Sequence, residues 1–233
     1  MAQLAKHADE VMSAIFSAAR RLREGMPENM GRNSRQTRDI IDQTRRTDAD
    51  MAGRTPKPKP DVENPKPDIK PFTPNANHNQ AEFRRQMREQ WDAIRNMDLA
   101  TWRRNRDAYA DGRPSESEAA QRAARQNWRD RMEDDLFDSN PELFDTDGNA
   151  LPELDSALDD WMSTQAATHR LDGIAGGDVT DISGLGDGNV NSSLGSQWRH
   201  RIDALETAYN NFVTDYPNVD LSEIYFDLPD LPF

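Results

Sequence analysis

Apolar side chains return every three or four residues in several stretches of this chain, the spacing that gathers them on one face of an α-helix. The first stretch covers residues 2–24, and a longer group lies between residues 81 and 137. The same spacing returns in residues 154–169 and 197–212. We therefore predict a mainly α-helical protein whose compact domain contains about five or six helices, with a short strand near residues 224–226.

The remaining segments divide the chain into functional parts. Seven of the 14 prolines fall between Pro56 and Pro74, which predicts an extended linker without a core of its own. The acidic, proline-containing end of the chain predicts an extended tail that is either laid over the domain or offered to a partner. The predicted parts are an amphipathic docking helix in 1–26, a polar and proline-rich linker in 27–80, a compact domain in 81–215 and the tail in 216–233.

A glycine-rich region interrupts the predicted helices of the compact domain. Residues 173–195 hold seven of the 12 glycines, a composition unsuited to a regular helix. We predict a long irregular loop there. Loops of this length inside a small domain are uncommon unless they carry function.

The composition excludes several classes of protein. The chain has no cysteine, so disulfide scaffolds, thiolate zinc sites and cysteine nucleophiles are excluded. It shows neither a run of about 20 apolar residues nor a standard secretory signal, which argues against stable membrane insertion and for export by another route.

Charge is divided unevenly along the chain. The formal net charge is −13. Residues 1–131 carry 26 basic and 20 acidic side chains, while residues 132–233 carry 3 and 22. Any contact with nucleic-acid phosphates therefore depends on the arginine-rich helices of the first half. The candidates are Arg103, Arg106 and Arg113, each of which has the alternative of an ion pair with the excess acids.

One histidine and one aspartate form the strongest candidate catalytic pair. His169 and Asp172 are three residues apart at the end of a predicted helix, a spacing that places both on one face. Asp172 can orient His169 as a general base toward water, or the pair can hold a divalent cation.

Polar residues after this pair extend the candidate site. Carboxylates are ligands for Mg²⁺, and short polar side chains can bind phosphate or sugar oxygens. The alternative is a glycine-rich loop with Asx turns and a helix cap. The predicted metal ligands are Asp172, Asp178 and Asp187, and the predicted substrate-binding residues are Asn191, Ser192, Ser193 and Gln197.

The run HRLDGIAGGDVTDISGLGDGNVNSSLGSQW resembles the signature of the polymorphic toxin type 15 domain, and the resemblance covers about residues 81–212. It implies an antibacterial effector nuclease, delivered by a contractile type VI secretion apparatus and neutralised in the producer by a cognate immunity protein. The HxxD motif of that family falls on His169 and Asp172.

These observations lead to one main hypothesis and two alternatives. The main hypothesis is a DNase that uses Mg²⁺ or another divalent cation, with His169 and Asp172 at its centre. We expect it to be made in the bacterial cytoplasm, to engage a secretion adaptor or carrier through its N-terminal region, and to act in the target-cell cytoplasm. The alternatives are a toxin that acts on RNA or nucleotides, and a non-enzymatic helical protein that binds a partner.

Overall fold

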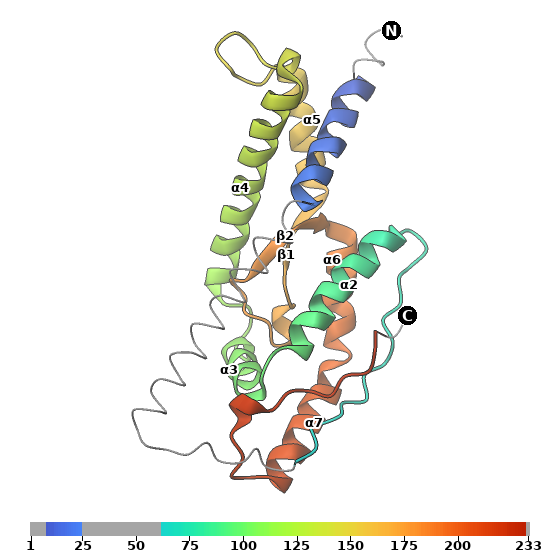
Figure 1. Cartoon of the computed structure of the whole chain (residues 1–233), viewed down its shortest axis with the longest axis vertical. Coiled ribbons are helices and arrows are strands. Elements are labelled where there is room, and N and C mark those ends of the chain that lie inside the picture. Colours follow the sequence, from blue (N-terminus) through green and yellow to red (C-terminus); the bar gives the residue numbers. More distant parts are fainter. Residues whose placement is uncertain (1–7, 25–61, 232–233) are drawn as a thin grey trace. The chain divides into compact units, whose positions relative to one another are not determined.

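The computed structural model describes residues 8–24 and 62–231, which belong to two compact units (Figure 1). The larger unit comprises residues 63–130 and 156–231, and the smaller one residues 8–24 and 131–155. Helices predominate, which confirms the predicted fold class. After the helix at 8–24, the elements are α2 (Gln80–Arg95), α3 (Leu99–Tyr109), α4 (Ser115–Ser139), η1 (Pro141–Leu143), α5 (Pro152–Ser163), β1 (Gln165–His169), η2 (Gly173–Ala175), β2 (Ile182–Asp187), α6 (Gly188–Arg199), α7 (Ile202–Asp215) and η3 (Leu221–Glu223).

Helices α2 and α3 of the larger unit begin where the sequence supplies capping side chains. Asn79 accepts hydrogen bonds from the backbone N–H groups of Ala81 and Glu82 at the start of α2. Asp98 caps α3 in the same way. Such caps satisfy amide groups that have no partner within the helix. The apolar stripe predicted for α2 is confirmed, because it is buried at Phe83, Met87, Trp91 and Ile94.

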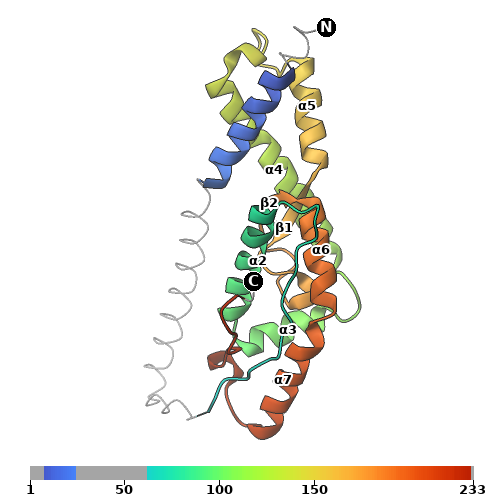
Figure 2. The same cartoon turned by 90° about the vertical axis from the view of Figure 1, so that its right-hand side faces the viewer.

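Residues 63–79 belong to the larger unit and pack against its helices, although the sequence predicts them as the end of a tether. They run alongside α6 and α7 in Figure 2. The Phe72 ring packs 4.8 Å from the Trp198 ring and 6.2 Å from the Trp91 ring. Gln197 also exchanges two hydrogen bonds with the main chain of Thr73. The prolines keep this segment extended, and its few apolar side chains bind it to the helices.

The C-terminal tail is laid over the same unit. Ile224, Phe226 and Leu228 are buried. The tail is held by main-chain contacts, among them a 2.9 Å hydrogen bond from Asp227 N to the Pro65 carbonyl. The predicted strand near residues 224–226 is reduced to one bridge, between Asp98 and Tyr225.

Three elements, η2, β2 and the start of α6, lie where the sequence predicts one irregular loop over residues 173–195. β2 pairs antiparallel with β1, and α6 begins immediately after β2. The predicted helix at 154–169 likewise ends at Ser163, and β1 follows it. Gly186 of β2 serves close packing, because a Cβ there would lie 2.6 Å from Nε2 of Gln86 on α2.

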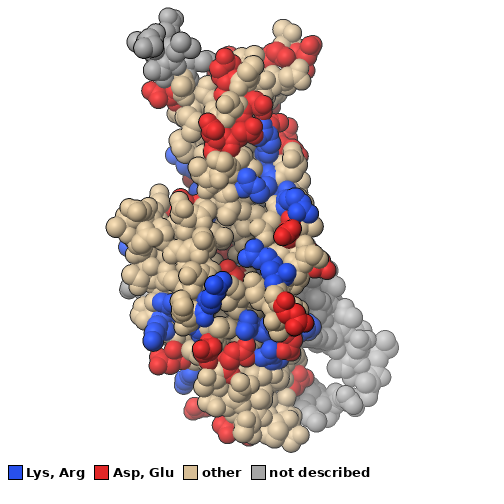
Figure 3. Space-filling model, turned by 180° about the vertical axis from the view of Figure 1, so that it is seen from behind, with Lys and Arg blue, Asp and Glu red and all other residues tan. Residues whose placement is uncertain are grey.

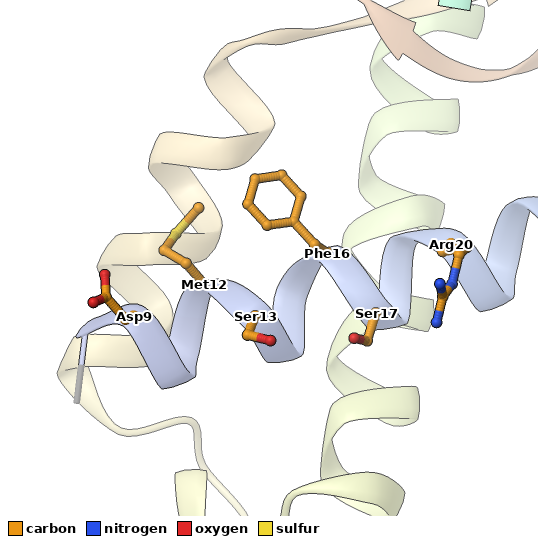
Figure 4. Close-up of a pocket in the computed structure, with 6 residues that line it drawn as sticks. All are labelled: Asp9, Met12, Ser13, Phe16, Ser17 and Arg20. Atoms are coloured by element: carbon orange, nitrogen blue, oxygen red, sulfur yellow. The ribbon is translucent and has the colours of Figure 1, made fainter. Parts of the chain in front are cut away.

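The smaller unit contains the N-terminal helix, whose amphipathic character is confirmed within residues 8–24. Val11, Ile15 and Ala18 are buried. Arg21 forms an ion pair with Asp135 on α4. The opposite side of the helix carries the shallow pocket drawn in Figure 4. Its lining residues are Asp9, Met12, Ser13, Phe16, Ser17 and Arg20.

Among the described helices, none has the length and apolar content that crossing a bilayer requires.

Candidate functional site

His169 is the last residue of β1 and lies almost completely buried, with 9% of its surface exposed. Its Nε2 atom is 3.1 Å from the carbonyl oxygen of Val179 and 3.3 Å from the Ser117 hydroxyl on α4. Because a carbonyl only accepts hydrogen bonds, Nε2 carries the proton in this arrangement. The other ring nitrogen, Nδ1, is therefore the one that can take up a proton from a reacting group.

The surroundings of His169 favour its neutral form. Burial is the largest effect and lowers the pKa of His169 below its ordinary value of 6.5. The charge of Asp172 acts in the opposite direction, as do the Val179 carbonyl and Asp181, while the charge of Arg113 lowers the pKa further. A neutral imidazole at pH 7 is the state that general-base catalysis requires.

Asp172 is the N-cap residue of the short helix η2, and its charge acts on His169. One carboxylate oxygen, Oδ1, accepts a 2.9 Å hydrogen bond from the backbone N–H of Ile174. Its main-chain carbonyl accepts hydrogen bonds from Ala175 and Gly177, which closes the turn. The other carboxylate oxygen, Oδ2, is directed toward Gly195 of α6 and has no hydrogen bond within the part of the chain that the structure describes.

The His169–Asp172 pair is therefore built differently from the arrangement the sequence predicts. The expected shared helix face is wrong: His169 ends a strand and Asp172 caps a turn. The local sequence resembles the end of a helix, but pairing with β2 draws residues 165–169 into the sheet.

Helix α6 supplies the polar surface next to Asp172. Asn191 and Ser192 lie four and three residues before Gly195, so each lies on the same side of the helix as Gly195. Gly195 places that face beside Asp172 Oδ2. Asn191 is half-buried and Ser192 is exposed, so both side chains can reach a ligand at this face.

Ser193 and Gln197 have contacts of a structural kind. The Gln197 amide binds both the carbonyl and the N–H of Thr73 and donates a 3.3 Å hydrogen bond to the Ser193 hydroxyl. These bonds attach the extended segment 63–79 to α6. These hydrogen bonds give Ser193 and Gln197 a structural role that does not require a bound substrate.

The three carboxylates predicted as metal ligands have separate surroundings. Asp178 accepts hydrogen bonds from the N–H and hydroxyl of Thr180, and Asp187 caps α6. Across residues 8–24 and 62–231, no three His, Asp or Glu side chains form a group suited to a metal ion. Mg²⁺ is commonly held by one or two carboxylates together with water and substrate phosphates, and the Oδ2 atom of Asp172 is suited to that role.

The three candidate arginines differ in how their charge is used. Arg103 and Arg106 both form ion pairs with Glu206, at 2.7 and 3.0 Å, and Arg106 also donates to the Ile174 carbonyl. Arg113 is exposed in the turn before α4 and has neither an ion pair nor a hydrogen bond to another described residue. Its charge nevertheless acts on His169. Figure 3 shows acidic and basic side chains side by side on the face drawn there.

Sequence reasoning misses three contributors to the site. Ser117 and the Val179 carbonyl fix the His169 ring, and they come from elements far apart in the chain. Gly195 adjoins Asp172. The only local signal among the three is Gly195, since glycine is unfavourable inside a helix.

The lowered pKa of His169 predicts a dependence of stability on pH. Between the folded pKa and 6.5, the unfolded chain binds more protons, so the free energy of unfolding rises with pH across that window. As pH falls below 6.5, this histidine therefore destabilises the folded state. We expect the His169→Gln chain to lose less stability between about pH 7 and pH 5 than the unmodified chain. Urea unfolding of both chains measures this, and parallel pH curves would contradict it.

Comparison with known proteins adds one finding. The family described as Novel toxin 15 matches residues 77–221 of the chain. The matched region runs from just before α2 to the start of η3 and includes His169, Asp172 and the polar face of α6. No curated protein matches the chain.

Proposed function

The chain belongs to the Novel toxin 15 family, and from this premise we propose that its toxin domain is a metal-dependent DNase that hydrolyses phosphodiester bonds at His169 and Asp172. The observation that carries the proposal is the state of His169. The ring is buried, its Nε2 atom is fixed by the Val179 carbonyl, and its lowered pKa keeps Nδ1 free of a proton at neutral pH.

In the proposed reaction His169 acts as the general base. Nδ1 takes a proton from a water molecule, the water oxygen forms a bond to phosphorus, and the bond to the leaving sugar oxygen breaks. The leaving oxygen takes a proton from solvent. Asp172 stabilises the imidazolium that forms, because opposite charges at this range attract. A divalent cation bound at Asp172 Oδ2 would neutralise phosphate charge.

Arg113 is the proposed phosphate contact. Arg103 and Arg106 are ion-paired with Glu206, and Arg103 also with Asp107, whereas Arg113 is exposed and acts electrostatically on His169. An arginine near the reacting group can donate charge-assisted hydrogen bonds to phosphate oxygens.

The partners follow from the family and from the proposed chemistry. A toxin of this kind is accompanied by a cognate immunity protein, because an active nuclease would damage the cell that makes it. We place action in the target-cell cytoplasm and engagement of a secretion adaptor or carrier in the N-terminal region. Part of that region, residues 1–7 and 25–61, lies outside the described residues.

The deciding experiment is plasmid cleavage by the purified full chain with Mg²⁺, with EDTA, and by the His169→Ala chain with Mg²⁺. The proposal predicts loss of supercoiled DNA only in the first reaction. Equal masses of total RNA are incubated in parallel. Cleavage of RNA alone would mean that the substrate is RNA and not DNA. Cleavage of neither nucleic acid would overturn the nuclease proposal.

Replacing Arg113 by glutamine is expected to lower kcat/KM for plasmid cleavage by about 10- to 100-fold, the loss of one hydrogen bond to a charged group. The dependence of log(kcat/KM) on log salt should become shallower by about one unit. The acid limb of the pH–rate profile should move to higher pH, because Arg113 lowers the pKa of His169.

Arg88→Gln is the matched control for this experiment, since Arg88 is an exposed arginine on α2. We expect nearly unchanged rates for that variant. Equal losses in the two variants would show that the effect of Arg113 reflects net charge alone.

A further inference from the structure

Gly195 stands in the interior of α6 without a conformational reason. The helix covers Gly188–Arg199, and Gly195 is not among the glycines with positive φ. Alanine would fit that backbone and would favour the helix, because glycine is among the weakest helix formers. The reason for glycine at position 195 therefore lies in the group packed beside it.

Among the described residues, the group close to this position is the carboxylate of Asp172. A Cβ atom at position 195 would lie 2.8 Å from Oδ2 and 3.8 Å from Cγ of Asp172, with no other non-local atom of residues 8–24 or 62–231 within 4 Å. Contacts of this kind below 3.0 Å force one of the two groups to move. Here the movable group is the carboxylate, which is the free end of a side chain.

The position of the Asp172 carboxylate is thus set from two sides. Oδ1 is held by the Ile174 N–H at 2.9 Å, and Oδ2 occupies the space that Gly195 leaves open. Any Cβ at position 195 would turn the carboxylate away from α6 and disturb the bond to Ile174. It would also change the distance between the negative charge and His169.

We propose that Gly195 is a positioning residue for Asp172, which keeps the carboxylate where it acts on His169 and faces the polar side of α6. This inference rests on the proposed nuclease function and deepens it. It predicts that the Gly195→Ala chain keeps or gains thermal stability while it loses cleavage activity.

The Gly195→Ala chain is expected to unfold at the same or a higher temperature than the unmodified chain, because alanine favours the helix and the displaced carboxylate can turn toward solvent. Its kcat for plasmid cleavage should fall by about 10- to 100-fold with little change in KM, since a displacement of about 1 Å is costly in a catalytic site. The acid limb of its pH–rate profile should move to lower pH. Asp172 raises the pKa of His169, and displacement removes part of that effect.

Ser196→Ala is the matched control, because Ser196 is the adjacent exposed residue of α6. It introduces the same residue into the same helix turn. Its unfolding temperature, kcat and pH profile should all stay close to those of the unmodified chain. A loss of activity in this control equal to that of Gly195→Ala would overturn the proposal.

An NMR titration of the His169 ring tests the geometry without any substrate. The titration midpoint should fall in Gly195→Ala and fall further in Asp172→Asn. If no chain cleaves nucleic acid but these shifts occur, the nuclease function fails while the positioning role stands. Unchanged midpoints in Gly195→Ala would overturn the positioning role even in an active nuclease.

A stability cycle covers the case in which Gly195→Ala folds poorly. In the Asp172→Ala background the obstructing carboxylate is absent, so adding Gly195→Ala should raise the unfolding temperature by more than it does in the unmodified chain. Equal changes in the two backgrounds would show that the space beside Gly195 does not serve Asp172, and would overturn the proposal.

Discussion

Replacing His169 with alanine should lower kcat for plasmid cleavage by about 10²- to 10⁴-fold, the range that a positioned general base supplies. The buried ring presents Nδ1 as the free nitrogen because Nε2 donates to the Val179 carbonyl. Alanine offers no group that can take the proton from water. The measurement is the rate of supercoiled plasmid loss at saturating DNA and Mg²⁺.

Two further chains separate chemistry from folding. His169→Gln keeps a side-chain N–H that can donate to Val179, so it should retain the fold while remaining inactive. His200→Ala alters an exposed histidine at the end of α6 and should cleave at the unmodified rate. If His169→Gln folds and cleaves like the unmodified chain, the assignment of the base is wrong.

Replacing Phe226 with alanine should lower the free energy of unfolding by about 3–5 kcal/mol, the usual cost of removing a buried phenylalanine side chain. Phe226 is 3% exposed and packs edge-on against the Trp102 ring, with 5.0 Å between ring centroids. The loss is a large part of the stability of an ordinary domain. Urea unfolding at fixed pH measures it.

Tyr225→Ala provides the neighbouring control, because Tyr225 is 37% exposed. Its cost should stay well below that of Phe226→Ala, since exposed substitutions usually change stability by about 0.5 kcal/mol or less. Equal losses at the two positions would mean that the tail does not bind the domain through its buried side.

The tail also supports the turn that Asp172 caps, through Trp102. The indole N–H of Trp102 donates a 2.9 Å hydrogen bond to the Ala175 carbonyl in η2, and Phe226 packs on the same indole. Asp172 begins that turn. Most of the tail lies beyond residues 77–221, so a segment outside the family match contributes to the surroundings of a family motif.

The sequence indicates the candidate site residues, whereas their geometry comes only from the structure. The HxxD spacing and the polar residues after it indicate His169, Asp172 and the α6 residues from the sequence alone. The roles of Arg103 and Arg106 depend on Glu206, which lies about a hundred positions away in the chain. No local pattern reveals such a partner, so only the structure distinguishes these arginines from Arg113.

The helices of this protein are determined largely by local sequence. Apolar spacing in α2 and the capping side chains Asn79 and Asp98 act within one or two turns, which is why these elements are visible in the sequence. The N-terminal helix is predicted on the same ground. Composition and charge likewise indicate which classes of function are excluded.

Tertiary structure decides the strands and the two extended segments. β1 and β2 are short, and each is stabilised by pairing with the other, so their hydrogen bonds exist only after the chain has folded back on itself. Gly186 and Gly195 act through close approach to side chains that are distant in sequence. Phe72 and Phe226 bind extended segments to helices whose positions depend on the whole domain. These interactions join residues that are far apart in the chain. The spacing of apolar residues along the sequence therefore cannot predict them.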